Sequence, residues 1–249
     1  MPTVGVEFAK VSYSLAGGHI LLHDISLDLE TGTTTALLGR SGSGKTTLLR
    51  MVNGLVTPTS GEVRVAGRAT RGYDTVALRR GIGYVIQETG LFPHMTVERN
   101  AGMALELAGR SKQEIAARVG EVLALAGLEY GEFRGRFPWQ LSGGQRQRVG
   151  VARALATDPM VLLMDEPFGA LDPLTRAEMQ TMLRGLLEKV RKTVLLVTHD
   201  LDEALYLAMR VVFVAQGEVV ADLPVEEVLR SENPHVRDYV RAVHRAVPA

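Results

Sequence analysis

The 249-residue sequence has no cysteine, which excludes disulfide bonds and metal sites built from thiolates. A reducing cytosol is therefore permitted, although the composition does not require one. An excess of charge is also missing, because 28 lysines and arginines balance 28 aspartates and glutamates. Nucleic-acid-binding proteins usually carry a basic excess or a basic face, so we expect no nucleic-acid partner.

Long apolar runs are missing as well. No stretch approaches the roughly 18 consecutive apolar residues from which a membrane-spanning helix is recognised. The N-terminal residues include Glu7 and lack the apolar centre of a secretory signal peptide, so we expect no such signal. What is present, 46% hydrophobic and 22% charged residues, is typical of a globular domain. If the protein acts at a membrane, it needs a partner that spans the bilayer.

The order of the expected elements indicates an α/β protein with a helical insertion. Alternating apolar residues at 4–15 and 25–29 predict two strands joined by a glycine turn. A strand at 33–38 leads into a glycine-rich loop, and a helix is expected at 45–55. Residues 88–149 then change to helical periodicity, which marks the insertion.

The second half returns to alternating strands and helices. Dense apolar runs at 161–164 and 193–198 are typical of parallel strands that are buried on both faces. Between them, Asp172 and Pro173 predict the N-cap and first residue of a helix. Apolar residues on either side of Gln216 and Gly217 predict a hairpin.

The glycine-rich loop at 39–46 matches the pattern G-x-x-x-x-G-K-[ST] in full, between an expected strand and an expected helix. Glycines let successive N–H groups point inward at phosphate oxygens, and the helix N-terminus adds favourable partial charge. Lys45 can reach the β- and γ-phosphates, and Thr46 can offer its hydroxyl to Mg²⁺. A merely flexible loop would need neither the full match nor this context. The expected nucleotide-binding residues of this loop are Gly39, Arg40, Ser41, Gly42, Ser43, Gly44, Lys45, Thr46 and Thr47.

Two adjacent carboxylates follow the apolar run at 161–164. Asp165 ends the expected strand, where a metal-positioning aspartate belongs in a protein with a phosphate loop. Glu166 is well placed to orient or deprotonate a water molecule that attacks the γ-phosphate. On their own, two acidic residues before a proline would indicate only a turn. The phosphate loop makes the catalytic interpretation the better one.

Residues 141–145 read Leu-Ser-Gly-Gly-Gln and open another expected helix. Ser142 and Gln145 form a capping-box pattern, which by itself predicts only a well-started helix. Gly143 and Gly144 at the same helix start would also make an anion site. One nucleotide does not need two such sites from one chain, and the residues alone leave this second site unexplained.

With these motifs, the sequence resembles the nucleotide-binding subunits of ABC transporters over nearly its whole length. The resemblance implies an α/β fold: a P-loop NTPase (RecA-like) core with an N-terminal antiparallel β subdomain and a helical insertion subdomain. It implies one ABC ATPase domain over residues 1–249. The catalytic core would cover 1–87 and 150–230, the helical subdomain with the signature motif 88–149, and a C-terminal helical tail 231–249.

The same resemblance explains the second anion site. In the family, the signature of one subunit contacts the γ-phosphate held by the phosphate loop of the other. Ser142, Gly143, Gly144 and Gln145 would therefore bind nucleotide across a dimer of two ATPase subunits. The sequence leaves open whether the second subunit is identical or a paralogue.

Further site residues come from the resemblance alone. Gln87 resembles the Q-loop glutamine, which senses the metal and the attacking water. Asp172 resembles the D-loop aspartate at the dimer interface, beside its expected capping role. His199 resembles the switch histidine that contacts the γ-phosphate, and Tyr13 resembles the aromatic residue that stacks on adenine.

The implied catalytic residues are Glu166, His199 and Gln87, and the implied Mg²⁺ residues are Thr46, Gln87 and Asp165. Arg40 occupies a position where many relatives have proline, which we do not expect to abolish phosphate binding.

The runs at 82–97, 200–204 and 233–240 resemble importers for glycine betaine, choline and related osmoprotectants. The implied partners are transmembrane permease subunits and, indirectly, an extracytoplasmic solute-binding protein, with the chain at the cytoplasmic face of the membrane. Leu91, Phe92 and Met95 are expected to line a groove for a permease helix. Many relatives carry a C-terminal regulatory domain, for which these 249 residues leave no room, so we expect no regulation of that kind.

Three alternatives stay open. One is an importer for another small solute, because the solute is selected by the permease and the binding protein. Another is an ABC ATPase that acts on ribosomes or DNA, although the usual doubled ATPase unit or inserted coiled coil is missing. The third is a module that binds nucleotide without hydrolysing it, against which Glu166 and His199 argue.

Overall fold

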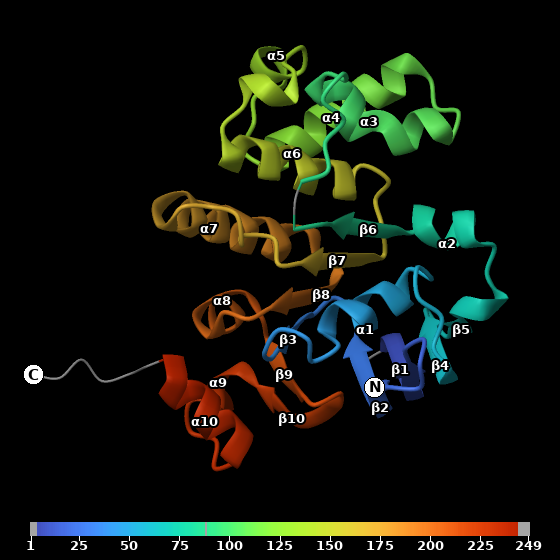
Figure 1. Cartoon of the computed structure of the whole chain (residues 1–249). Coiled ribbons are helices and arrows are strands. Elements are labelled where there is room, and N and C mark those ends of the chain that lie inside the picture. The colour runs from blue at the N-terminus through green and yellow to red at the C-terminus, as the bar shows by residue number, and fades with distance from the viewer. Residues whose placement is uncertain (1–3, 88, 244–249) are drawn as a thin grey trace, which may run out of the picture. The chain divides into compact units, whose positions relative to one another are not determined.

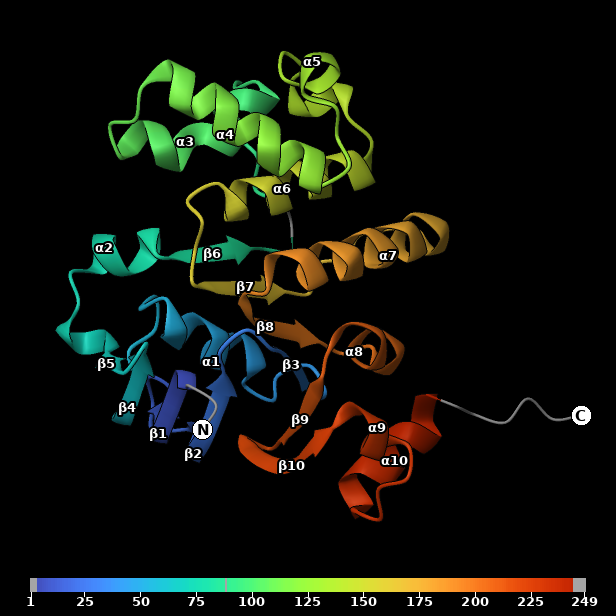
Figure 2. The same cartoon turned by 180° about the vertical axis from the view of Figure 1, so that it is seen from behind.

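The computed structural model describes residues 4–87 and 89–243 (Figure 1, Figure 2). Residues 1–3, 88 and 244–249, which include part of the expected C-terminal tail, lie outside the described residues. The chain divides into two compact units, and each is described by itself. Unit 1 is Met1–Thr75 with Thr193–Ala249, and unit 2 is Val76–Lys192. The division into subdomains expected from the sequence stays a prediction.

Unit 1 contains the antiparallel sheet that the sequence predicts at the N-terminus. Its strands run in the order β2 (Ile20–Glu30), β1 (Val4–Ser14), β4 (Ser60–Val65), β5 (Arg68–Ala69). The alternation of the sequence becomes burial, because Val6, Phe8 and Val11 of β1 are all at most 1% exposed. A 3-10 turn, Thr70–Gly72, follows β5.

The second sheet of unit 1 carries the parallel strands. β3 (Thr34–Leu38) pairs in parallel with β8 (Thr193–Thr198) and with β9 (Arg210–Ala215). β10 (Glu218–Pro224) closes the expected hairpin on β9. Every residue of β3 and β8 is buried, which explains their continuous apolar sequences.

Four α-helices accompany this sheet in the described part of unit 1: α1 (Lys45–Val52), α8 (Leu201–Leu207), α9 (Val225–Val228) and α10 (Pro234–Val243). The helix expected at 45–55 ends at Val52 instead. The Asn53 side chain accepts the N–H of Leu55, and Gly54 adopts φ 66°, so the chain turns there. In both views α10 lies beside β10 at the C-terminal end of this unit.

Unit 2 holds two parallel strands, β6 (Ile82–Val85) and β7 (Val161–Asp165). Its helices are α2 (Thr75–Arg80), α3 (Val97–Leu107), α4 (Lys112–Leu125), α5 (Tyr130–Phe133), α6 (Gly143–Leu155) and α7 (Pro173–Val190), with a 3-10 turn at Pro138–Gln140. Figure 1 shows α3, α4, α5 and α6 gathered into one helical cluster.

Helix starts in unit 2 follow the capping signals in the sequence. Ser111 and Ser142 each complete a capping box, and Asp172 caps α7. The 3-10 turn presents Trp139, whose ring stacks on Phe137 with centroids 6.2 Å apart while remaining 73% exposed. Among the residues that the structure describes, no helix has the length and apolar character needed to cross a bilayer.

Candidate functional site

The glycine-rich loop between β3 and α1 is shaped by close backbone approaches. A Cβ atom on Gly39 would lie 2.1 Å from the Val214 carbonyl oxygen. Gly44 adopts φ 99°, and a Cβ there would lie 2.4 Å from Leu22 Cδ2. Neither position can hold a larger residue without moving its surroundings, so the glycines are required by the fold of the loop itself.

Lys45 places its charge against the same loop. Its side chain is buried, and Nζ donates to the carbonyl oxygens of Gly39 and Arg40 at 2.8 Å each. A weaker bond at 3.4 Å reaches Ser43 Oγ. A buried ammonium that rests on neutral carbonyls is well suited to exchange them for phosphate oxygens, which carry charge. Thr46 and Thr47 follow in the first turn of α1 and are half-buried.

The parallel register brings His199 to the edge of the sheet where the loop begins. Leu38 pairs with Thr198, so Gly39 and His199 are the next residues of neighbouring strands. The exposed His199 is followed by Asp200, whose N–H donates to Thr198 Oγ1 at 3.0 Å. The Asp200 side chain in turn caps α8 by accepting the Glu203 N–H.

Tyr13 lies in the antiparallel sheet of the same unit. It is half-buried and pairs with Leu22, whose side chain packs against Gly44. Tyr13 is therefore the register partner of a residue that packs against the phosphate loop.

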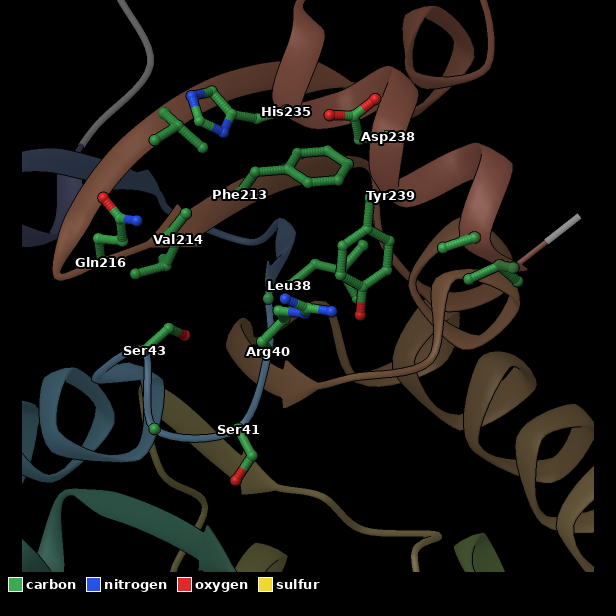
Figure 3. A pocket seen from close by; sticks show the side chains of 16 residues that line it. Leu38, Arg40, Ser41, Ser43, Phe213, Val214, Gln216, His235, Asp238 and Tyr239 are labelled. Carbon is green, nitrogen blue, oxygen red and sulfur yellow. The ribbon is translucent and has the colours of Figure 1, made fainter.

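A cavity of about 830 Å³ lies on another side of the loop, between it, the β9–β10 hairpin and α10 (Figure 3). Arg40 and Ser41 line it from the loop, and Phe213, His235 and Tyr239 line it from the other two elements. The residue that departs from the usual proline, Arg40, lines this cavity, while its carbonyl oxygen accepts hydrogen bonds from the Lys45 ammonium and the Ser43 N–H within the loop.

In unit 2, β6 and β7 end at one edge, with Val85 paired to Met164. Asp165 is buried at the end of β7 and accepts a 3.3 Å hydrogen bond from the Tyr84 hydroxyl through Oδ2. Glu166 follows in the left-handed region at φ 46°, an uncommon conformation for a residue with a side chain, and turns the chain sharply after the strand.

Gln87 and Glu166 come together beside Gly169. A Cβ on Gly169 would lie 3.5 Å from Gln87 Nε2 and 3.8 Å from Glu166 Oε2. The Gln87 amide and the Glu166 carboxylate therefore both lie near Gly169.

The signature motif packs against the start of α7. Ser142 Oγ accepts the Gln145 N–H at 3.2 Å, and Gln145 Oε1 accepts the Ser142 N–H at 3.0 Å. A Cβ on Gly144 would lie 2.7 Å from Thr175 Cγ2, so the two helix starts are in contact. Hydrogen bonds from the side chain and backbone of Thr175 hold the pKa of Asp172 below its ordinary value.

The expected site residues thus divide between the two units. Unit 1 brings together Tyr13, Gly39, Arg40, Ser41, Gly42, Ser43, Gly44, Lys45, Thr46, Thr47 and His199. Unit 2 brings together Gln87 with Asp165 and Glu166, and separately Ser142, Gly143, Gly144 and Gln145 with Asp172.

Two residues that sequence reasoning missed shape the segment after Gln87. Asn100 is fully buried; its amide donates to the carbonyl oxygens of Phe92, Met95 and Thr96 and its oxygen accepts the Phe92 N–H. Arg153 of α6 donates to the carbonyl oxygens of Thr89 and Gly90, and burial lowers its pKa. A polar residue on the buried side of α3 is the only signal that could have pointed to Asn100.

Comparison with known families decides the identity of this arrangement. Residues 22–169, which span the phosphate loop, the signature and both carboxylates, match the family described as ABC transporter. The chain belongs to the ABC transporter family. It is therefore an ATP-binding protein of the ABC ATPase class, as the resemblance of its motifs predicts, and its fold is that of a P-loop NTPase.

Three curated relatives show which kinds of ABC protein this chain is similar to in sequence. The glycine betaine uptake system ATP-binding protein YehX of Escherichia coli is 48% identical over 94% of this chain and 76% of its own length. The glycine betaine/carnitine/choline transport protein OpuCA of Bacillus subtilis is 42% identical over 94% of this chain, which spans only 62% of the relative. The sulfate/thiosulfate import protein CysA of Nocardia farcinica is 46% identical over 92% of this chain and 69% of its length.

A solved structure supports the same fold. The dimeric structure of a post-hydrolysis state of the ATP-binding cassette MJ0796, bound to ADP and Pi, is 35% identical to this chain with a TM-score of 0.78. The similarity covers 88% of this chain and 98% of that one. An ABC cassette of closely similar fold therefore forms a dimer and holds the products of hydrolysis.

Proposed function

We propose that this ABC ATPase binds Mg-ATP between two copies of the cassette and hydrolyses it to power the import of a quaternary-amine osmoprotectant. The observation that carries the proposal is the pairing of two phosphate-binding devices in one chain. The phosphate loop with Lys45 belongs to unit 1, and the capped, glycine-containing start of α6 belongs to unit 2. A head-to-tail pair of chains uses both devices for each nucleotide.

In this proposal the phosphate loop holds the β- and γ-phosphates with backbone N–H groups and with the Lys45 ammonium. The Tyr13 ring stacks on the adenine. The signature residues Ser142, Gly143, Gly144 and Gln145 of the second copy contact the γ-phosphate from the opposite side, and Asp172 lies at the interface.

The proposed metal site suits Mg²⁺. Thr46 supplies a hydroxyl, Gln87 an amide oxygen and Asp165 a carboxylate, which are the hard oxygen donors that Mg²⁺ prefers beside phosphate. The Asp165 carboxylate is buried and already held by the Tyr84 hydroxyl, so its orientation is set before a metal arrives. Bound Mg²⁺ would neutralise charge that develops on the phosphates during transfer.

Hydrolysis then depends on Glu166, Gln87 and His199. Glu166 accepts a proton from water while the water oxygen forms a bond to the γ-phosphorus and the bond to the ADP oxygen breaks, giving ADP and phosphate. Gln87 orients the same water, a role supported by the position of its amide, which like the Glu166 carboxylate lies near Gly169. The His199 imidazole donates to the γ-phosphate.

Transport requires a partner in the membrane, so we place the chain at the cytoplasmic face, bound to permease subunits that receive solute from an extracytoplasmic binding protein. The segment at 89–96 is the proposed contact with the permease. Asn100 and Arg153 fix its backbone, while Phe92, Pro93 and His94 are exposed on it. Leu91 and Met95 are half-buried beneath this surface, and Glu88 lies outside the described residues.

The solute class rests on the relatives YehX and OpuCA. The similarity to CysA supports a second candidate function, which is the import of an oxyanion such as sulfate. Purification from membranes in mild detergent should recover the chain with a permease, and the complex should be reconstituted into vesicles with its binding protein. We expect Mg-ATP to drive uptake of labelled glycine betaine or choline, and a complex that takes up sulfate but neither amine would overturn the osmoprotectant assignment.

A further inference from the structure

The C-terminal helix α10 is anchored to the rest of unit 1 through its start and its first turn. At its start, Asn233 accepts the N–H of His235 and donates its amide to the Val220 carbonyl oxygen of β10 at 2.9 Å. One turn later, Val236 is completely buried in the core cluster that contains Leu38, the last strand residue before the phosphate loop. The helix is thus a built part of unit 1 rather than a loose extension.

Tyr239 is the residue through which α10 reaches the catalytic edge. Its ring packs edge-on against Phe213 of β9, with centroids 5.9 Å apart at 77°. Its hydroxyl donates a 2.6 Å hydrogen bond to the backbone carbonyl oxygen of His199. Figure 3 shows the ring extending from α10 into the cavity that it shares with Arg40 of the phosphate loop.

This hydrogen bond completes the support of the backbone around His199. On the following residue, the N–H of Asp200 is held by Thr198 Oγ1, and the Asp200 side chain is held by the start of α8. The Tyr239 bond comes from a different element and fixes the carbonyl group of His199 itself. The imidazole is carried on a backbone that two hydrogen bonds hold, one to the Asp200 N–H and one to the His199 carbonyl oxygen.

We propose that Tyr239 is a positioning residue for ATP hydrolysis, which acts by holding the His199 backbone so that the imidazole meets the γ-phosphate. The proposal rests on the role of His199 in the proposed function. It makes α10 a support for the backbone of His199, although Tyr239 lies 40 residues further along the chain.

The Tyr239→Phe variant tests this because it keeps the ring on Phe213 and removes only the hydroxyl. With the full chain, we expect kcat for ATP to fall by about two- to tenfold, the rate effect of one lost hydrogen bond, with KM little changed. The matched control is Tyr73→Phe, which removes another hydroxyl bond to a backbone carbonyl oxygen, that of Val65, far from the site. This control should keep the wild-type kcat.

A double-mutant cycle separates positioning from general stability. In the His199→Ala background, Tyr239→Phe should lower the residual ATPase no further, because the group that it positions is gone. An independent readout is the NMR signal of the His199 ring, identified by its loss in His199→Ala. This signal should shift in Tyr239→Phe and stay in place in Tyr73→Phe.

The outcomes distinguish the inference from the function on which it rests. If His199→Ala is impaired but Tyr239→Phe has wild-type kcat and an unshifted ring signal, the positioning role is wrong and the role of His199 stands. An equal loss from Tyr239→Phe with and without His199 would also overturn the inference. If His199→Ala hydrolyses ATP normally, the role of His199 in the proposed function fails and the inference falls with it.

Discussion

At the scale of single residues, the charge of Lys45 has the clearest consequence. Its ammonium is buried against the carbonyl oxygens of the loop that is expected to hold the phosphates. Lys45→Ala should lower kcat/KM for ATP by about 10²- to 10³-fold, the usual scale for a lost group that stabilises developing charge. Steady-state ATPase measurements test this. Arg50→Ala, which removes an exposed cation from the same helix, should stay near wild type, and unchanged turnover in Lys45→Ala would refute the phosphate-loop assignment.

The lowered pKa of Asp172 leads to a prediction about how the stability of the fold depends on pH. Because Thr175 lowers the folded-state pKa of Asp172, its ionised form stabilises the fold above the unfolded pKa. That contribution is lost as pH falls through the depressed folded value, below about pH 4. Asp172→Asn keeps a capping oxygen but cannot titrate. Thermal unfolding of both proteins between neutral and acid pH should show a wild-type advantage that shrinks toward acid, and a constant difference would contradict the assignment.

At the scale of elements, the segment after Gln87 combines a rigid backbone with an exposed apolar tip. Asn100 holds its turn with three donated hydrogen bonds and one accepted, while Phe92 remains 40% exposed. Phe92→Glu should reduce coupled uptake in reconstituted vesicles by about tenfold or more, the effect of losing an interface anchor. Basal ATPase should change little, because the substitution lies outside the nucleotide residues.

The matched control is Leu107→Glu, which places the same charge on a side chain that is 70% exposed at the far end of α3. It should support normal uptake. Equal losses of uptake in both variants would mean that charge on the helical cluster, rather than a contact at Phe92, disturbs the complex. Crosslinkers at Phe92 that never capture a membrane subunit would exclude the proposed contact.

The elements also show how far sequence reasoning reaches. Alternation, buried apolar runs and capping signals predicted strands β1, β2, β3, β7 and β8, the β9–β10 hairpin and the starts of α6 and α7, because each is a local signal. Helices α5, α8 and α9 have only 4 to 7 residues, too few turns for a periodicity to be visible. The expected boundary of the helical insertion at residue 149 falls inside α6, which runs from Gly143 to Leu155, and that division stays a prediction.

Some features of the candidate site could likewise be predicted from the sequence, and others could not. Contiguous motifs such as the phosphate loop could be found from sequence because their spacing carries the chemistry. The position of Gln87 near Gly169, the bonds from Arg153 to Thr89 and Gly90 and the bond from Tyr239 to His199 join residues distant in sequence. Such contacts depend on how the strands and helices pack, which no local pattern encodes.

At the scale of the whole molecule, the separate roles proposed for Asp165 and Glu166 determine whether two chains stay together as an ATP-bound dimer. Glu166→Gln keeps the size of the side chain but removes the base and one negative charge, so ATP should bind while hydrolysis falls by about 10²- to 10⁴-fold. If hydrolysis separates the two copies, this variant should accumulate as an ATP-bound dimer. Size-exclusion chromatography with and without Mg-ATP measures this directly.

Asp165→Asn is the informative comparison, because it removes the neighbouring carboxylate instead. We expect weaker dependence on Mg²⁺ and no stable dimer, since the buried Asp165 positions the metal rather than the water. A monomeric Glu166→Gln protein with normal turnover would show that the base lies elsewhere. Dimers in both variants would show that the two carboxylates do not have separate roles.

The exposed stack of Trp139 on Phe137 gives the protein a built-in optical reporter. The chain has one tryptophan, so all indole fluorescence comes from a point three residues before Ser142 of the signature. An exposed indole emits at longer wavelength than a covered one, and a partner that covers this surface would shift the emission. Stopped-flow mixing with Mg-ATP could therefore follow the signature region in real time, without a dye or an introduced cysteine.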